Sequence, residues 1–110
     1  MKTSSEGKLL RVFIGEGDRW QGRPLYEAII QAAREEGMAG ATVLKGALGF
    51  GAKSHLHTGG FLGMSKDLPI IIEIVDTEEK TQKFLPRLDE LVRDGLVTLE
   101  KVGVLTYRGA

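Results

Sequence analysis

The segment Leu68-Pro69-Ile70-Ile71-Ile72-Glu73-Ile74-Val75 is the most apolar stretch of this chain. Its β-branched side chains favour an extended backbone. Apolar residues occupy both of its alternating faces, which predicts a strand that is buried on both sides. A strand of this kind lies inside a sheet, so other segments of the chain must supply its neighbours.

Three further strands are predicted around this segment. The first covers residues 9–14 and ends at the glycines of Gly15-Glu16-Gly17. The second runs from about residue 41 to residue 48, and the last covers residues 97–107. All three are rich in aliphatic side chains, as strands usually are.

Two helices separate these strands. The first is predicted over residues 24–37, and the second over residues 76–95, with Asp76 as the expected N-cap and Glu79 completing a capping box. Their apolar residues recur at helical spacing; they are Leu25, Ala28, Ile29, Ala32 and Ala33 in the first helix and Phe84, Leu85, Leu88, Leu91 and Val92 in the second.

The order strand, helix, strand, strand, helix, strand predicts an α+β fold of the ferredoxin-like βαββαβ type. Two right-handed crossovers then place both helices on one face of a four-stranded antiparallel sheet. Residues 1–7 are predicted to be a flexible N-terminal tail, and residues 8–110 a single domain. The other sheet face has no cover from this chain although it is apolar, so we expect self-association across it.

Bulk composition narrows the classes of function. Lysine plus arginine and aspartate plus glutamate number 15 each, so the net charge is zero and nothing favours nucleic-acid binding. The chain has no cysteine, which excludes disulfides and thiol nucleophiles. The N-terminal residues lack the apolar core of a signal peptide, and no apolar run is long enough to span a membrane, so we expect a cytoplasmic protein.

A glycine-rich segment between the second and third strands is longer than a hairpin needs. It begins Gly46-Ala47-Leu48-Gly49-Phe50-Gly51-Ala52-Lys53-Ser54-His55-Leu56-His57, and we expect a flexible loop over residues 46–66. Exposed main-chain amides at Gly49 and Gly51, with the charge of Lys53, suit an anion or a partner protein. The alternative is a surface loop without a ligand.

A second cluster of charges follows the first strand. Arg19 and Arg23 are candidate anion donors near a helix N-terminus, with Glu16 and Asp18 beside them. The alternative is an ion-pair network that stabilises the turn. Trp20 is a packing residue in one interpretation and a stacking surface in the other.

His55 and His57 alternate in an extended segment, so both imidazoles can face one metal ion. Two ligands do not complete a structural zinc site, although self-association could gather copies from several chains. No arrangement of nucleophile, base and acid is identifiable, so we expect a protein that is not an enzyme.

Several motifs resemble those of a family of uncharacterised PII-like proteins, known as domain of unknown function 190. They are Ile14-Gly15-Glu16-Gly17-Asp18-Arg19-Trp20, Gly22-Arg23-Pro24-Leu25-Tyr26-Glu27-Ala28-Ile29, Ala39-Gly40-Ala41-Thr42-Val43-Leu44-Lys45-Gly46, Gly49-Phe50-Gly51-Ala52 and Asp67-Leu68-Pro69-Ile70-Ile71-Ile72-Glu73-Ile74-Val75-Asp76. The resemblance covers about residues 8–107. It implies a PII-like ferredoxin fold and a homotrimer.

The resemblance to the PII proteins proper covers fewer motifs than the resemblance to this uncharacterised family. Gly49-Phe50-Gly51 followed by Lys53 is similar to the start of the PII T-loop, which approaches nucleotide phosphates between subunits. The glycine-rich loop that PII proteins carry before their last strand is replaced here by Arg93-Asp94-Gly95-Leu96.

These observations favour a trimeric PII-like signalling or regulatory protein. We expect it to bind a small anionic effector, an adenine nucleotide, at subunit clefts, to need no cofactor, and to contact a membrane transporter or enzyme target through the 46–66 loop. The alternative is a trimeric metal-responsive or ion-tolerance protein of the same superfold that uses His55 and His57. A single-stranded nucleic-acid module is less well supported, because Phe13 is its one candidate stacking residue.

Overall fold

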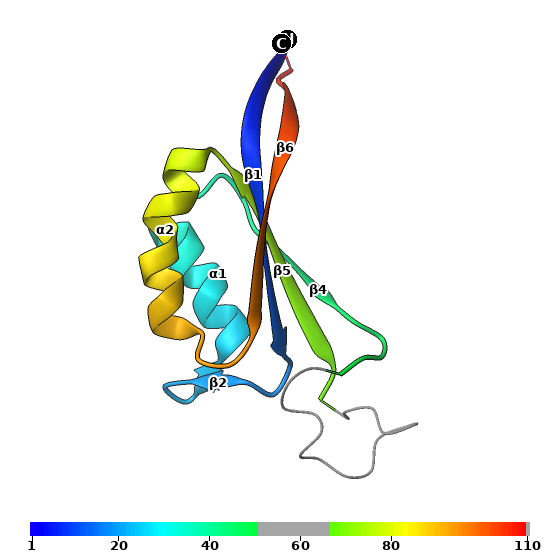
Figure 1. Cartoon of the computed structure of the whole chain (residues 1–110), viewed down its shortest axis with the longest axis vertical. Coiled ribbons are helices and arrows are strands. Elements are labelled where there is room, and N and C mark those ends of the chain that lie inside the picture. Colours follow the sequence, from blue (N-terminus) through cyan, green and yellow to red (C-terminus); the bar gives the residue numbers. More distant parts are fainter. Residues whose placement is uncertain (51–66, 110) are drawn as a thin grey trace.

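The structure is a computed structural model that describes residues 1–50 and 67–109. Within these ranges, one antiparallel sheet has the strand order β4-β5-β1-β6 (Figure 1). Its strands are β1 (Lys2–Gly15), β4 (Thr42–Lys45), β5 (Pro69–Asp76) and β6 (Leu96–Tyr107). The central position of β5 agrees with its apolar sequence.

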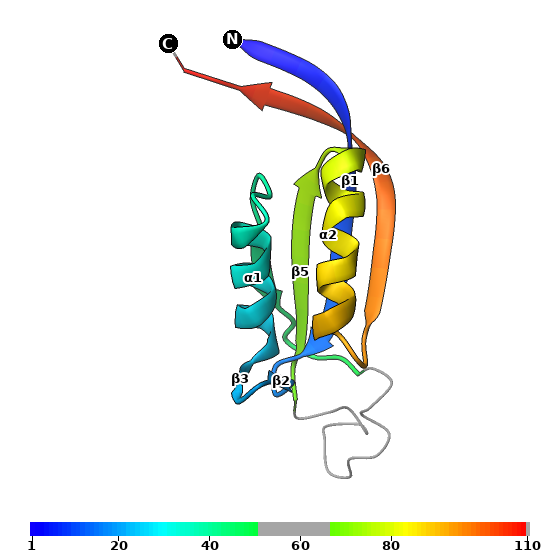
Figure 2. The same cartoon turned by 90° about the vertical axis from the view of Figure 1, so that its left-hand side faces the viewer.

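Helices α1 (Leu25–Glu35) and α2 (Glu78–Leu91) lie side by side on one face of this sheet, as Figures 1 and 2 show. This arrangement confirms the predicted ferredoxin-like α+β fold. Neither helix of the described chain has the length and apolar character needed to cross a membrane. The residues that the helices bury are Leu25, Ala28, Ile29, Ala32 and Ala33 from α1 and Thr81, Phe84, Leu88 and Leu91 from α2.

Strand register decides which side chains meet the helices. Directly paired residues share a face, and successive residues alternate between faces. The helix-covered face holds Leu10, Val12 and Ile14 of β1, which pair with Ile74, Ile72 and Ile70 of β5, and all six are buried. These side chains form the core together with both helices.

The opposite face, which we call the open face, has no helix over it in the described chain (Figure 1). Leu96 is 60% exposed, Leu44 44% and Val75 38%. These values show an apolar surface in contact with water. The residues that the register places on the open face include Leu9, Arg11, Phe13, Thr42, Leu44, Ile71, Glu73, Val75, Leu96, Thr98 and Glu100.

A charged group of three residues lies among the apolar residues of the open face. Arg11 Nε donates to Glu73 Oε2 at 2.8 Å, and Arg11 Nη1 donates to Glu100 Oε1 at 2.6 Å. The hydrogen bond to Glu73, foremost, raises the pKa of the Arg11 guanidinium. The arginine of this face is therefore already paired within its own sheet.

The N-terminal residues are not a tail, so the prediction for residues 1–7 is wrong in this respect. Strand β1 starts at Lys2 and pairs with β6 as far as Tyr107. The reason is that β6 is long enough to supply a ladder partner for each of these polar residues. Main-chain hydrogen bonds to β6 hold this part of β1. The sequence prediction recognised strands by their apolar side chains, which residues 2–7 lack.

The structure also contains an element that was not predicted and a strand that is shorter than predicted. A short hairpin of β2 (Arg19–Trp20) and β3 (Arg23–Pro24) precedes α1. Strand β4 ends at Lys45 instead of reaching residue 48, because its partner strand β5 begins at Pro69, which has no N–H group for a further ladder bond.

The N-cap of α2 is Thr77, one residue after the predicted Asp76. Thr77 Oγ1 accepts a hydrogen bond from the main-chain N–H of Lys80 at 3.1 Å. The Asp76 carboxylate instead accepts from the N–H groups of Ala39 at 2.8 Å and Thr77 at 2.7 Å. Asp76 therefore joins the chain after α1 to the start of α2.

Thr81 provides a test of the packing under α2. Its side chain is buried, and its Oγ1 has no hydrogen-bond partner among the described residues. We expect Thr81→Val to raise the free energy of unfolding by about 1 kcal/mol, because it removes an unsatisfied buried hydroxyl. Urea denaturation measures the change.

Thr77→Ala is the matched control, four residues earlier on the same helix. It removes the N-cap and is expected to lower the free energy of unfolding by about 1 kcal/mol. A Thr81→Val protein less stable than the wild type would show that the hydroxyl is satisfied in solution.

Candidate functional site

The turn after β1 is held by Asp18. The Gly15 N–H donates to Asp18 Oδ2 at 3.1 Å, and the Asp18 N–H donates to the Gly15 carbonyl at 3.2 Å. The Asp18 carbonyl also accepts from the Leu25 N–H at 2.8 Å, which satisfies a free amide at the start of α1. Asp18, a predicted ligand residue, therefore connects β1 to α1.

Arg19 and Arg23 lie in the β2–β3 hairpin, and both are exposed. The turn between the strands has positive φ at Gln21 (47°) and Gly22 (81°), as a two-residue type I′ hairpin requires. Arg19 Nη2 donates to the Gly22 carbonyl at 2.8 Å, which leaves other guanidinium N–H groups of this side chain to face solvent.

Trp20 of the same hairpin packs against the hydrophobic core. This contact confirms the packing interpretation of Trp20. The aromatic ring fixes the hairpin to the body of the protein, and thereby sets where the two arginines lie.

The two ends of the 46–66 loop meet the turn after β1. On one side, Lys45 Nζ lies 2.6 Å from Glu16 Oε2. On the other, the Glu16 N–H donates to the Leu68 carbonyl at 2.8 Å, and the Gly17 N–H donates to Asp67 Oδ1. Residues 15–18 are therefore directly bonded to the residues at both ends of the loop.

This end of the sheet is polar and rich in charge. Besides Lys45 it gathers the carboxylates of Glu16, Asp18 and Asp67, each of which accepts from a donor given above. The hydrogen bond to Glu16, more than the charge attraction between the two groups, raises the pKa of Lys45 and favours its ammonium form. The acids hold the local structure, and Arg19 and Arg23 of the hairpin that follows this turn are exposed.

Gly46 and Gly49 both lie against the ring of Pro69. The Gly46 N–H donates to the Pro69 carbonyl at 2.7 Å. A Cβ atom added at Gly46 would come within 2.5 Å of Pro69 Cγ, and one added at Gly49 within 3.1 Å. The loop therefore begins on a segment where the backbone passes close to β5, and Gly46 is needed for that approach.

The other predicted site residues, Gly51, Lys53, His55 and His57, lie outside the described residues. Their roles stay predictions. Elsewhere, over residues 1–50 and 67–109, no three His, Cys, Asp or Glu side chains are grouped as a metal ion would need.

Sequence reasoning missed Lys45 and Asp67, although both flank the loop. The antiparallel register pairs Gly15 with Pro69, and this pairing brings the end of β1 to the start of β5. A prediction that combined this register with the charged residues at the strand ends could have found both side chains.

Comparison with known proteins gives one family. A family model for DUF190, described as "Uncharacterized ACR, COG1993", matches residues 7–104. A "UPF0166 protein" from Aquifex aeolicus (strain VF5) is 36% identical over 98 residues, which cover 89% of this chain and 92% of that protein. A second "UPF0166 protein", from Methanocaldococcus jannaschii, is 36% identical over 105 residues and covers 94% of each chain.

Among solved structures, the chain is similar to CPII from Thiomonas intermedia K12, bound to ADP, AMP and acetate. The TM-score is 0.64 at 17% sequence identity, and the match covers 93% of this chain and 91% of that one. CPII is described as a nitrogen regulatory PII-like protein, so the fold is that of the PII-like proteins.

Gly46→Ala tests the close approach at the start of the loop. We expect it to lower the free energy of unfolding by about 1–3 kcal/mol, because the new methyl group would overlap the Pro69 ring. Gly40→Ala is the matched control, since a Cβ there meets nothing within 4 Å. Thermal unfolding of both variants compares them, and equal stability would show that the Gly46 segment moves away from Pro69 in solution.

Proposed function

The chain belongs to the DUF190 family, and on that premise we propose that it is a trimeric PII-like regulatory protein that binds a small anionic effector. The effector is a nucleotide, held in the clefts between subunits, and the protein catalyses no reaction on it. The 46–66 loop transmits occupancy of the site to a target protein, either a membrane transporter or an enzyme.

The open face supports the proposed trimer. Four of its apolar residues form one row across all four strands, made of Leu44, Ile71, Phe13 and Leu96. Exposed apolar surfaces of this kind mark protein interfaces. Packing three copies around one axis would remove the row from water in each of them.

The observation that carries the nucleotide proposal is the set of bonds between residues 15–18 and both ends of the loop. These bonds hold Lys45 and Asp67, which flank the loop, against the turn that leads into the hairpin of Arg19 and Arg23. Arg19 and Arg23 would supply donors from the hairpin, and the loop would supply Lys53 and the amides of Gly49 and Gly51. Glu16 and Asp18 would hold the two parts in place.

Two further observations support a nucleotide as the effector and the loop and hairpin as its phosphate donors. CPII, which has the same fold, is described as bound to ADP, AMP and acetate. In this chain the short segment Arg93-Asp94-Gly95-Leu96 stands where PII proteins carry a glycine-rich loop. The 46–66 loop and the hairpin arginines are then the main phosphate donors of the proposed site.

Calorimetric titration tests this proposal directly. AMP, ADP, ATP and cyclic AMP are titrated into the wild type, Arg19→Ala and Lys53→Ala. Each alanine variant should weaken binding by about 1.5–3 kcal/mol, the range for hydrogen bonds to charged groups. Lys83→Ala is the matched control, because Lys83 lies on the surface of α2 and pairs with Glu79, and it should bind as the wild type does.

The same experiment includes the metal-responsive alternative. Zinc and copper are titrated into the wild type and into a double variant, His55→Ala with His57→Ala. If no nucleotide binds the wild type below millimolar concentration, while a metal ion binds and the double variant loses it, the nucleotide proposal is wrong and the alternative replaces it.

A further inference from the structure

Strands β1 and β6 continue beyond the rest of the sheet as a two-stranded arm, which we call the ribbon (residues 2–7 and 102–107). Figures 1 and 2 show it projecting past the ends of both helices. Pairing of β1 with β5 starts at Lys8, so over residues 2–7 the only described strand that pairs with β1 is β6.

The ribbon is regular to its tip. Its register runs without a break from Lys2 paired with Tyr107 to Gly7 paired with Val102. At the tip, the N-terminal ammonium donates to the Arg108 carbonyl at 2.8 Å, and the Arg108 N–H donates to the Met1 carbonyl at 2.8 Å. Two strands alone are marginally stable in water, so a ribbon of this length requires packing on one of its faces.

The two faces of the ribbon differ in charge. One, which we call the uncharged face, consists of small or β-branched residues in three directly opposed pairs: Thr3 with Thr106, Ser5 with Val104 and Gly7 with Val102. The other, which we call the charged face, carries Lys2, Ser4, Glu6, Gly103, Leu105 and Tyr107, and the pair Lys8 and Lys101 continues it just beyond the ribbon.

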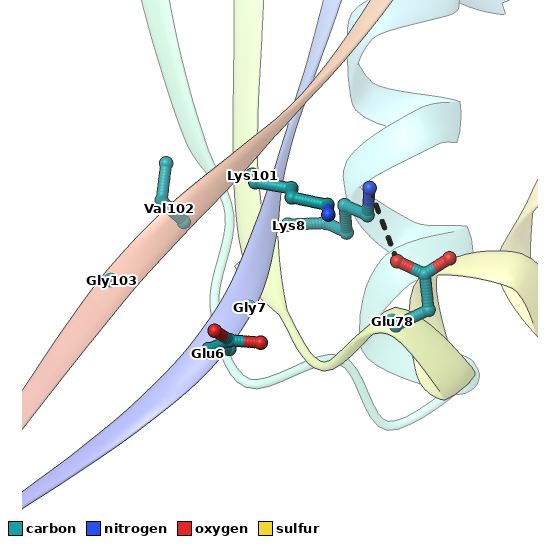
Figure 3. Close-up of a pocket in the computed structure, with 7 residues that line it drawn as sticks. All are labelled: Glu6, Gly7, Lys8, Glu78, Lys101, Val102 and Gly103. Carbon is teal, nitrogen blue, oxygen red and sulfur yellow. Dashed lines mark ion pairs between the residues drawn. The ribbon is translucent and has the colours of Figure 1, made fainter.

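The charged face borders a pocket at the foot of the ribbon. Figure 3 shows Lys8 and Lys101 directed toward α2, where Lys8 Nζ lies 3.2 Å from Glu78 Oε2, while Val102 points to the other side. Four charged side chains line this pocket, Glu6, Lys8, Glu78 and Lys101, and such a surface is well solvated as it stands. The foot of the charged face is therefore stable in water without a cover, whereas nearer the tip Leu105 is 53% and Tyr107 70% exposed.

The uncharged face is continuous with the open face of the sheet. Alternation along β1 puts Gly7 on the same side as Leu9 and Arg11, and alternation along β6 does the same for Val102 and Glu100. At Gly7 a Cβ would come within 2.8 Å of the Asp76 carbonyl, so a larger residue would disturb the junction of ribbon and sheet.

We propose that the uncharged face of the ribbon packs on a second copy of this chain and so extends the interface that the open face forms. The inference rests on the trimer proposed above and adds a separate contact to it. A second copy fits this face because two uncharged surfaces of small residues meet without repulsion and allow close packing of one sheet on another. Nucleic acid or an anionic membrane would find no cation there.

Two neighbouring serines provide the test. Ser4 and Ser5 are both exposed in the single chain, but Ser5 lies on the uncharged face and Ser4 on the charged one. The chain has no cysteine, so Ser5→Cys and Ser4→Cys each introduce one thiol with almost no change of shape. The rate of maleimide labelling is measured on purified protein, and sedimentation of the same samples gives the oligomeric state.

In the oligomer, the Ser5→Cys thiol should react at least about tenfold more slowly than the Ser4→Cys thiol, because it reacts only when the contact opens. In strong denaturant the two rates should be equal. A Ser5→Cys protein that sediments as a smaller species, while Ser4→Cys does not, would also support the contact.

Equal labelling rates in an intact oligomer would overturn the ribbon contact and leave the proposed function standing. A wild type that sediments as a monomer would remove the proposed trimer and the ribbon contact together. Val104→Lys and Leu105→Lys form a second pair on the two faces, and only Val104→Lys should weaken the oligomer. If Leu105→Lys alone weakened it, the opposite face would be the one that is covered.

Discussion

The pairing of β1 with β5 on one side and β6 on the other is the constraint on which the rest of the structure depends. It fixes which side chains face the helices and which face away, because a shift by one residue would exchange the two faces. Helices cover one of these faces and, in the described chain, leave the other open (Figure 1). The apolar open face, the proposed trimer and the proposed ribbon contact all follow from this one register.

A subunit interface on the open face has to accommodate the charges of Arg11, Glu73 and Glu100. Burial of an unpaired charge is strongly unfavourable, whereas a charge with well-placed partners can be tolerated. Arg11 already bonds to Glu73 and Glu100 within its own sheet. The apolar row beside it can therefore pack against another subunit without leaving the guanidinium unpaired.

Much of the fold could be predicted, because periodicity marks the strands and helices that pack in the core. The ribbon was missed because Thr3, Ser4 and Ser5 carry no apolar alternation, and its stability depends on a partner strand from the other end of the chain. In the candidate site, the cluster of charges before the first helix predicts Arg19 and Asp18 as ligand residues, and those roles stay predictions, whereas Lys45 required the register of distant strands. The roles of Lys53, His55 and His57 stay predictions.

The central claim is that three chains assemble on the open face and hold a nucleotide between them. Native mass spectrometry of protein purified from its own cells, with bound small molecules retained, tests it most directly. The account predicts a species of three chain masses with added mass that matches an adenine nucleotide and is lost on denaturation. A single-chain mass without any added small molecule, at micromolar concentration, would contradict it.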